Sequence, residues 1–526
     1  MIERQTQSVA YWQSFSITQR DTEFLHDLML DAGRPLTAQA LALALIGERC
    51  RQEESNLRSE LARGTLFQPK KRFGVGDKVI FPALDYRLGE VVGIRAGENP
   101  EYGPFDVLAV DFGPDRRQRS YAAGLSAPHK LNADTPDLLL SQPAVPPEKL
   151  LATVAAQVPG SLSTQLALNP DLARFEDFWL LRDQMASIHV GHLNIAEAAI
   201  EIRAAPVETT TLVKEMELPA EISPEVVAFS LQSAMTVDGR FDQVGPGEIR
   251  SWYLCRMEPA EALHVPELLR IEPAVYDRDA LTPELFQLDW ELDDEWSDTG
   301  DTAAPGVKPS GPASITLLLI YPHLASGTLP LNKHSRSFFP HGHGERTLVT
   351  LVDGRWGQRF SGWVVHNGRY IAGLRHMFEQ HKLPAGALIT LERRDDSGEI
   401  YVDYRPRRMR REWTRRAQLI EDNRLDIQLR KQEVSCEYDE LAIIGDDRPE
   451  DVLKLRANPL YAHAPLSELV YEVLEDLAGL SGSVHAKTVY SAVNVLRRCS
   501  PGPILAALAT DRRLVNLGDC LFQLRG

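Results

Sequence analysis

The sequence predicts a multidomain α+β protein built from winged-helix (helix-turn-helix) units combined with small antiparallel β-barrels. Three observations predict this class. The chain has 526 residues, more than one ordinary domain holds. Segments with helical periodicity alternate with short β-branched or aromatic runs that Gly and Pro interrupt. Helical segments also end twice in hairpin-like text, at 238–254 and 513–524, and helices followed by a hairpin are the outline of a winged helix.

The first helices carry their own start and stop signals. Thr18 can cap a helix that stops near Gly33, and Thr37 can cap a second helix over 38–46. A third helix is expected over 48–63, where acids and arginines balance, so we expect contact with protein rather than DNA. Residues 1–67 are therefore predicted to form a helical, helix-turn-helix-like domain, with a small helical bundle as the alternative.

Residues 68–132 change character and predict a Tudor-like small β-barrel. FGVGDKVIFPAL, GEVVGIRAG and FDVLAVDFG are short strand-like runs separated by turn residues, and Gly76 and Gly89 are expected to permit the turns. The Pro-rich text that follows predicts a linker over 133–160.

Helical text returns at 161–288 and ends in the hairpin-like stretch, which predicts a winged-helix-like domain. FEDFWLLRDQM at 175–185 is expected to be an amphipathic helix. Residues 289–301 hold seven acids and no base, and Pro, Gly and Ser follow them. We therefore expect a flexible acidic and Pro/Gly linker over 289–312 that divides the chain.

The second half repeats the alternation. Residues 313–404 are mostly strand-like around one short helix, which predicts a β-rich domain. An Arg-rich helical segment is expected over 405–460, and a C-terminal winged-helix-like domain over 461–526.

The run RPRRMRREWTRR at 405–416 is the strongest charge feature of the sequence. Guanidinium groups pair with phosphates, and a tryptophan can stack on a base or pack internally. The alternative is a solvated face that pairs with acids of this chain, those at 289–301 included. A helix beginning near His485 adds further basic positions. The predicted nucleic-acid-binding residues are Arg405, Arg407, Arg408, Arg410, Arg411, Trp413, Arg415, Arg416, Lys487, Arg497 and Arg498.

No catalytic constellation has suitable spacing, so we expect a protein that is not an enzyme. A phosphate loop, a dinucleotide fingerprint and a nucleophile elbow are all missing from the sequence. His341 and His343, like His189 and His192, lack the further ligands that a metal needs nearby, and are expected to be polar loop or cap residues. No cofactor, metal or small-molecule substrate is predicted.

Composition adds the expected compartment. The net charge of −17 argues against coating nucleic acid everywhere but permits local basic patches. Five widely spaced cysteines are typical of reduced thiols, and MIERQTQ does not begin a signal peptide. The apolar run 315–321 is too short to span a bilayer. We expect a cytoplasmic protein without membrane contact, nucleoid-associated if it binds DNA.

Three local resemblances support these expectations. The stretch FGVGDKVIFPALDYRLGEVVGIR resembles the Tudor-like barrel of CarD-type RNA-polymerase-interacting domains, although Asp85–Arg87 replace their usual His-Gly. HLNIAEAA with RFDQVGPGEIRSWYL, and HAKTVYSAV with LVNLGDCLFQL, look like HARE-HTH-type winged helices. WVVHNGRYIAGLRHMFEQHKLPAGALITL is similar to the DNA-binding pseudobarrel of plant transcription factors and some restriction enzymes. None of the three implies a catalytic residue.

The expected function is therefore non-enzymatic nucleic-acid binding. DNA is the expected ligand, in transcription or another DNA transaction. The alternative is a protein–protein adaptor or scaffold whose winged helices and barrel dock on a protein such as RNA polymerase. A third reading, an enzyme centred on His341 and His343, depends on a metal.

Overall fold

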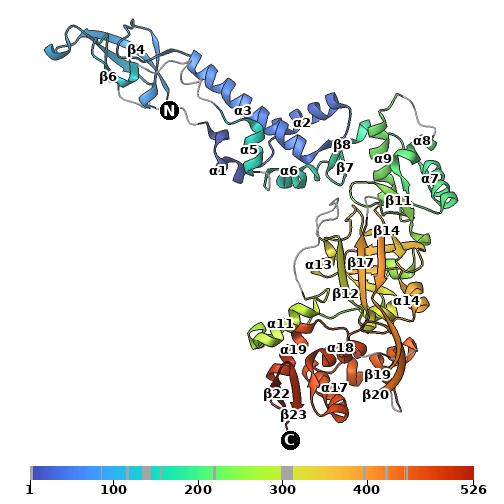
Figure 1. Ribbon diagram of the computed structural model, residues 1–526. Coiled ribbons are helices and arrows are strands. Elements are labelled where there is room, and N and C mark those ends of the chain that lie inside the picture. The colour runs from blue at the N-terminus through green and yellow to red at the C-terminus, as the bar shows by residue number, and fades with distance from the viewer. Residues whose placement is uncertain are drawn as a thin grey trace. The chain divides into compact units, whose positions relative to one another are not determined.

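The computed structural model (Figure 1) describes most of the chain and divides it into two compact units. The first unit comprises Met1–Ser187 and Pro219–Ser233, and the second comprises Ile188–Leu218 and Ala234–Gly526. Both contain helices and strands, so the predicted α+β class is confirmed. The described residues are 4–84, 86–113, 118–132, 144–154, 157–216, 221–297, 312–394, 398–420, 424–442, 445 and 448–525.

The first unit begins with helices that share one hydrophobic core with a small three-stranded sheet. Thr18 and Asp21 form a capping box at the start of α2, Gly33 ends this helix in the left-handed conformation, and Thr37 caps α3, as the sequence predicts. The two helices expected over 38–63 are one continuous helix. The elements are α1 (Val9–Gln13), α2 (Gln19–Ala32), β1 (Leu36–Thr37), α3 (Ala38–Ala62), α5 (Pro147–Val154), α6 (Val158–Leu166), β7 (Leu172–Phe175) and β8 (Phe178–Leu181).

Residues 172–181 differ from the prediction, because the expected amphipathic helix is a hairpin. Strands β7 and β8 pair with each other, and β8 also pairs with β1, which gives the antiparallel order β1-β8-β7. Trp179 of β8 is buried in the same core as Leu25 and Leu41 of the helices. Most of the described part of the expected linker is helical, in α5 and at the start of α6, and both helices pack on α3. Residues 133–143 and 155–156 lie outside the described part.

A five-stranded sheet is inserted between α3 and α5. Its order is β2-β3-β4-β5-β6, where only β2 and β3 pair in parallel. Phe67, Phe81 and Val91 are buried in its core. Gly89 lies inside β4 and not in a turn: a Cβ there would lie 2.5 Å from Val110 Cγ1. The strands are β2 (Thr65–Leu66), β3 (Lys78–Phe81), β4 (Arg87–Ala96), β5 (Asp106–Asp111) and β6 (Arg119–Ala123).

A helix–strand–helix–helix–hairpin connectivity follows at 190–254. Strand β9 pairs with β11, and β11 pairs with β10, so the strand before the second helix joins the hairpin. The first unit has the same connectivity, with the five-stranded sheet and α5 inserted before its last helix. The elements are α7 (Val190–Arg203), β9 (Val207–Glu208), α8 (Thr209–Glu215), α9 (Pro224–Val237), β10 (Phe241–Gln243) and β11 (Ser251–Leu254).

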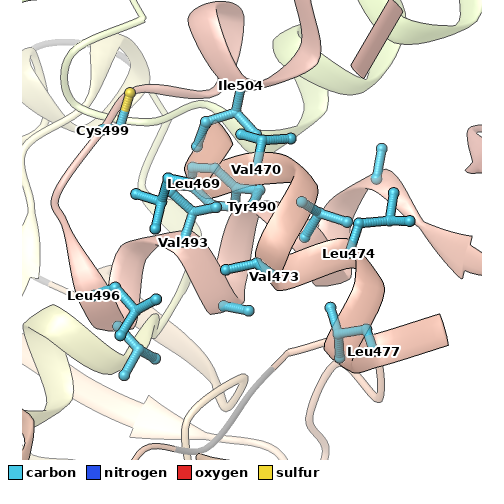
Figure 2. Packing of buried hydrophobic residues seen from close by; sticks show 14 of the residues in the cluster. Leu469, Val470, Val473, Leu474, Leu477, Tyr490, Val493, Leu496, Cys499 and Ile504 are labelled. Carbon is cyan, nitrogen blue, oxygen red and sulfur yellow. The ribbon is translucent and has the colours of Figure 1, made fainter. Parts of the chain in front are cut away.

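The C-terminal residues repeat this connectivity a third time, with sheet order β21-β23-β22. Figure 2 shows how side chains of the three helices meet: Leu469 and Val473 of α17, Tyr490 and Val493 of α18, and Ile504 of α19 share one core. The elements are α17 (Leu466–Ser481), β21 (Val484–His485), α18 (Ala486–Leu496), α19 (Pro501–Thr510), β22 (Leu514–Gly518) and β23 (Leu521–Leu524).

A nearly closed seven-stranded sheet occupies the middle of the second unit. Its order is β12-β17-β18-β14-β15-β16-β13, and only β14 and β18 pair in parallel. Ile389, Val402 and Val364 are buried in its core. The elements are β12 (Ser314–Leu318), α12 (Tyr321–Ser326), β13 (Thr328–Pro330), α13 (Lys333–Arg336), β14 (Arg346–Asp353), β15 (Arg359–Val365), β16 (Tyr370–Ala372), α14 (Arg375–His381), β17 (Leu388–Arg393) and β18 (Ile400–Tyr404).

The Arg-rich segment is the largest departure from the sequence prediction. Its first part is a long antiparallel ribbon of β19 (Pro406–Leu419) and β20 (Leu425–Cys436), drawn in orange in Figure 1, and not a helix. Only the later part of the segment is helical, in α15 (Pro449–Ala457) and α16 (Pro459–Ala462).

The expected acidic linker is also structured where it is described. It begins inside helix α11 (Pro283–Leu292), which follows the short α10 (Ala260–Leu263), and continues to Ser297. Asp294 and Glu295 are buried. Residues 298–311, the rest of this prediction, lie outside the described part of the chain.

Candidate nucleic-acid interface

The β19–β20 ribbon is held at both ends by different hydrophobic cores. Ala417, Leu425 and Ile427, near the turn, belong to the core of the C-terminal helices. Val434 and Cys436, at the other end, belong to the core of the seven-stranded sheet. The middle of the ribbon therefore has a fixed backbone although its side chains are largely exposed.

Register assigns the side chains of this middle part to two faces. Arg411 pairs with Glu433, Trp413 with Lys431, and Arg415 with Leu429, and paired residues of an antiparallel ladder share a face. The opposite face carries Thr414, which is buried. The face that carries Trp413, called here the Trp413 face, therefore points away from the protein.

Trp413 is the centre of the Trp413 face, and 62% of its surface is exposed. The ammonium group of Lys431 lies 5.0 Å from the centroid of its ring, a cation–π contact. Leu429, on the same face, is 46% exposed, and Met409, earlier in β19, is 62% exposed. Apolar and cationic side chains thus alternate over one solvent-facing surface.

Several arginines of the ribbon already have protein partners. Arg405 pairs with Glu437 at 3.5 Å, Arg407 with Glu412 at 2.8 Å, and Arg411 with Glu433 at 3.2 Å; Arg415 donates to the carbonyl oxygen of Glu440 at 2.9 Å. The alternative of internal pairing is therefore right in part. The acids that pair with these three arginines, however, lie in the ribbon or directly after it, and not at 289–301.

Other cations of the ribbon remain available. Within the described part of the chain, Arg408, Arg410, Arg430 and Lys431 form no ion pair, and all four are exposed. Arg430 and Lys431 are absent from the residues predicted from the sequence. The alternation of Leu425, Ile427 and Leu429 with polar residues is a strand signal that would have pointed to them.

The three basic residues predicted near the C-terminus occupy other places. Lys487 forms an ion pair with Asp439, and Arg497 donates to the carbonyl oxygens of Ala462 and Ala464. The side chain of Arg498 is 0% exposed. In this structure the chain itself covers the guanidinium of Arg498, so the contact with nucleic acid that the sequence predicts has no exposed group here.

Arg498 instead joins the acidic stretch to the C-terminal helices. Its guanidinium donates to Asp294 Oδ2 and Glu295 Oε1, both at 2.6 Å, and to Asn494 Oδ1 at 2.7 Å. Tyr490 donates to Asp294 as well, and Nε2 of His323 lies 3.2 Å from Glu295 Oε1.

The electrostatics of this cluster follow from burial and from Arg498. Burial raises the pKa of Asp294 above its ordinary value, against the opposing charge of Arg498. Burial has the same tendency at Glu295, but the charges of Arg498 and His323 outweigh it and hold the pKa of that carboxyl well below its usual range. The cluster therefore connects residues 294–295 to the C-terminal helices through buried ion pairs. The sequence predicts these acids as part of a solvated linker.

The helices that precede the three hairpins, α6, α9 and α19, contain no Lys or Arg. Helix α19 is also nearly covered, since Leu505 and Leu508 share a core with Leu285 and Leu288 of α11. A helix that enters a DNA groove needs basic or polar side chains facing the phosphates and bases. These helices lack the basic ones.

The histidines considered as metal ligands have protein partners. His341 stacks on His366 at 3.7 Å between ring centroids, and Nε2 of His366 lies 2.8 Å from Thr347 Oγ1; burial lowers the pKa of His366 to about 3. His189 caps α7 together with His192. Among the described residues, no three His, Cys, Asp or Glu side chains are grouped to hold a metal ion.

The chain matches no protein-family model. A search of curated proteins and a search of solved structures likewise found no similar protein. In the described part of the chain, no helix has both the length and the apolar character needed to cross a membrane.

Proposed function

We propose that this protein is a non-enzymatic nucleic-acid-binding protein and that the β19–β20 ribbon is its binding element. One observation carries the proposal: an exposed tryptophan shares the outward face of the ribbon with Lys431, a cation without an ion pair among the described residues, and the two ends of this ribbon are anchored in separate cores. The role in transcription or another DNA transaction rests on the sequence resemblances alone.

Charge distribution supports a local interface of this kind. Residues 405–437 contain ten Arg or Lys and six Asp or Glu, whereas the whole chain carries a net charge of −17. A local positive surface on an acidic protein favours phosphate contact at that surface and disfavours non-specific coating elsewhere.

The first and last of the three helix–strand–helix–helix–hairpin segments are proposed to be winged helices that do not read DNA; the middle segment shares their connectivity, but most of its α9 belongs to the first unit. Their connectivity, in which the strand before the second helix joins the hairpin, supports the fold. The absence of Lys and Arg from the helix before each hairpin supports a role in protein docking or in internal packing. The five-stranded and seven-stranded sheets are, by the same sequence resemblances, proposed to be the CarD-like barrel and the DNA-binding pseudobarrel.

Fluorescence anisotropy on labelled 20-nucleotide DNA, both single-stranded and duplex, tests the proposal. The variant R408A/R410A/R430A removes three unpaired cations. Since each phosphate contact contributes about 0.9 to the logarithmic salt slope on duplex DNA and about 0.7 on single strands, the slope should fall by about 2 to 3.

The control is R51A/R58A/R63A, which removes the same charge from three exposed, ion-paired arginines, two in α3 and one at its C-cap. This control should bind as the wild type does. Absent binding, or equal losses in the two triple variants, contradicts the proposal.

A protein–protein adaptor is the second candidate, favoured by the absence of Lys and Arg from the helices that precede the hairpins. Here the winged helices and barrel dock on a partner such as RNA polymerase, and no nucleic acid is contacted. A pull-down from lysate with and without nuclease separates the two functions: a partner retained after nuclease treatment, together with no binding in the anisotropy assay, favours the adaptor.

A further inference from the structure

From the Trp413 face we infer that the ribbon binds unpaired nucleic acid, with a base stacked on Trp413, in preference to intact duplex. The inference rests on the proposed function and specifies its ligand. It starts from the position of the indole, which is exposed although its strand neighbour Thr414 is buried.

The indole suits the face of a base better than its edge. In a duplex the bases are stacked on one another, and the grooves offer only their edges, which proteins read chiefly with side chains that form two hydrogen bonds to one base. An indole has a single N–H donor and no acceptor. Its large apolar surface instead matches the faces of bases, which are free only where the strand is unpaired.

The neighbours of Trp413 extend this apolar surface. Leu429 is diagonal to Trp413 on the Trp413 face, and Met409 lies earlier on the same strand; both are about half or more exposed. A duplex presents no apolar surface of matching size to them except through unstacking of a base step, which costs free energy.

The cations of the Trp413 face lie where they can contact the phosphates of a nucleic-acid strand that has one base stacked on Trp413. Residues two apart on a strand lie about 7 Å apart, so Arg411 and Arg415 stand at that distance on either side of Trp413, and Lys431 lies opposite it. The Arg411–Glu433 pair is exposed on both sides and is weak for that reason, so a phosphate can replace the carboxylate.

The rigid backbone of the ribbon contributes to affinity. Both ends are fixed in hydrophobic cores, so the stacking platform exists before the ligand arrives and little backbone order is gained on binding. A protein partner would also find an apolar and basic surface here. Charge complementarity with phosphates favours nucleic acid, and the protein partner is one outcome of the test below.

The test uses the full chain and three tryptophan variants. W413A removes the platform, W413F keeps a smaller ring, and W290A removes a tryptophan of similar exposure (67%) elsewhere in the same unit. Each is titrated against a labelled mixed-sequence 20-nucleotide single strand and against its duplex.

We expect the wild type to bind the single strand at least about tenfold more tightly than the duplex. W413A should weaken single-strand binding about 5- to 150-fold, which is the fold-change for ~1–3 kcal/mol of stacking per base, while changing duplex binding less than about twofold. W413F should retain most of the affinity, and W290A all of it. Quenching of tryptophan emission on binding should be smaller in W413F than in W290A.

Three results overturn the inference, and they are distinguishable from failure of the proposed function. Equal or tighter binding of duplex, or a W413A variant that binds the single strand as the wild type does, refutes base stacking but leaves nucleic-acid binding by the ribbon intact. Absence of binding to either DNA refutes both, and a protein partner whose binding is lost in W413A then takes their place.

Discussion

Replacement of Arg498 by alanine should destabilise the second unit more than any other substitution of an arginine that the sequence predicts to bind nucleic acid. Its guanidinium donates to Asp294, Glu295, Asn494 and the carbonyl oxygen of Cys499, and none of its side chain is exposed. Without it, two buried carboxylates lose their compensating charge.

The magnitude follows from the cost of an uncompensated buried charge. Removal of one partner of a buried ion pair costs about 3–5 kcal/mol. The second unit has 324 residues, and at about 2.1 cal/mol/K of unfolding entropy per residue each kcal/mol lowers its Tm by roughly 1.5 °C, so a decrease of about 4–7 °C is expected. Differential scanning calorimetry measures the decrease, and the transition of the first unit should not move.

Two further variants make the reasoning falsifiable. R512A removes an exposed arginine from the next loop and should leave Tm unchanged. The triple variant R498M/D294N/E295Q removes all three charges and should recover part of the loss, because neutral replacement of the whole buried group leaves none of these charges unpaired. An R498A variant that melts within about 2 °C of R512A would refute the argument.

Two other predictions concern pH dependence and packing. Burial, with the charge of Asp242, raises the pKa of Glu258 to about 8. Because the folded pKa lies above the unfolded value of about 4.3, the native state binds the extra proton; this stabilisation is complete below about pH 4 and is lost as pH rises through 8. Melting curves from pH 5 to 9 should therefore decline more steeply for the wild type than for E258Q, and parallel curves would contradict the shift. G89A should destabilise the five-stranded sheet by about 1–3 kcal/mol, because the new Cβ would lie 2.5 Å from Val110 and 2.9 Å from Phe112. Urea denaturation measures this loss, with G160A, where the same Cβ meets no atom within 4 Å, as the control.

The ribbon shows why the candidate site was only partly predictable. Its composition identified Arg408, Arg410 and Trp413, because charge and aromatic content are properties of the sequence. The strand conformation of residues 406–416 was missed because this part of β19 buries almost nothing, so no period-2 alternation marks it; the alternation in the ribbon lies in β20, at Leu425, Ile427 and Leu429. The conformation follows from pairing with residues 425–436 and from the two cores that hold its ends.

The sequence by itself determined the features that depend on near neighbours. The capping residues Thr18 and Thr37, the left-handed Gly33 and the strands around 78–96 follow from signals within a few residues. Only the tertiary structure decided the fate of the charges. Asp294 and Arg498 are 204 residues apart in the chain, yet they form one buried pair. The residues next to an acid in the sequence do not show whether its carboxylate will face water or pair with a buried arginine. That partner is brought to it only by the folding of the chain.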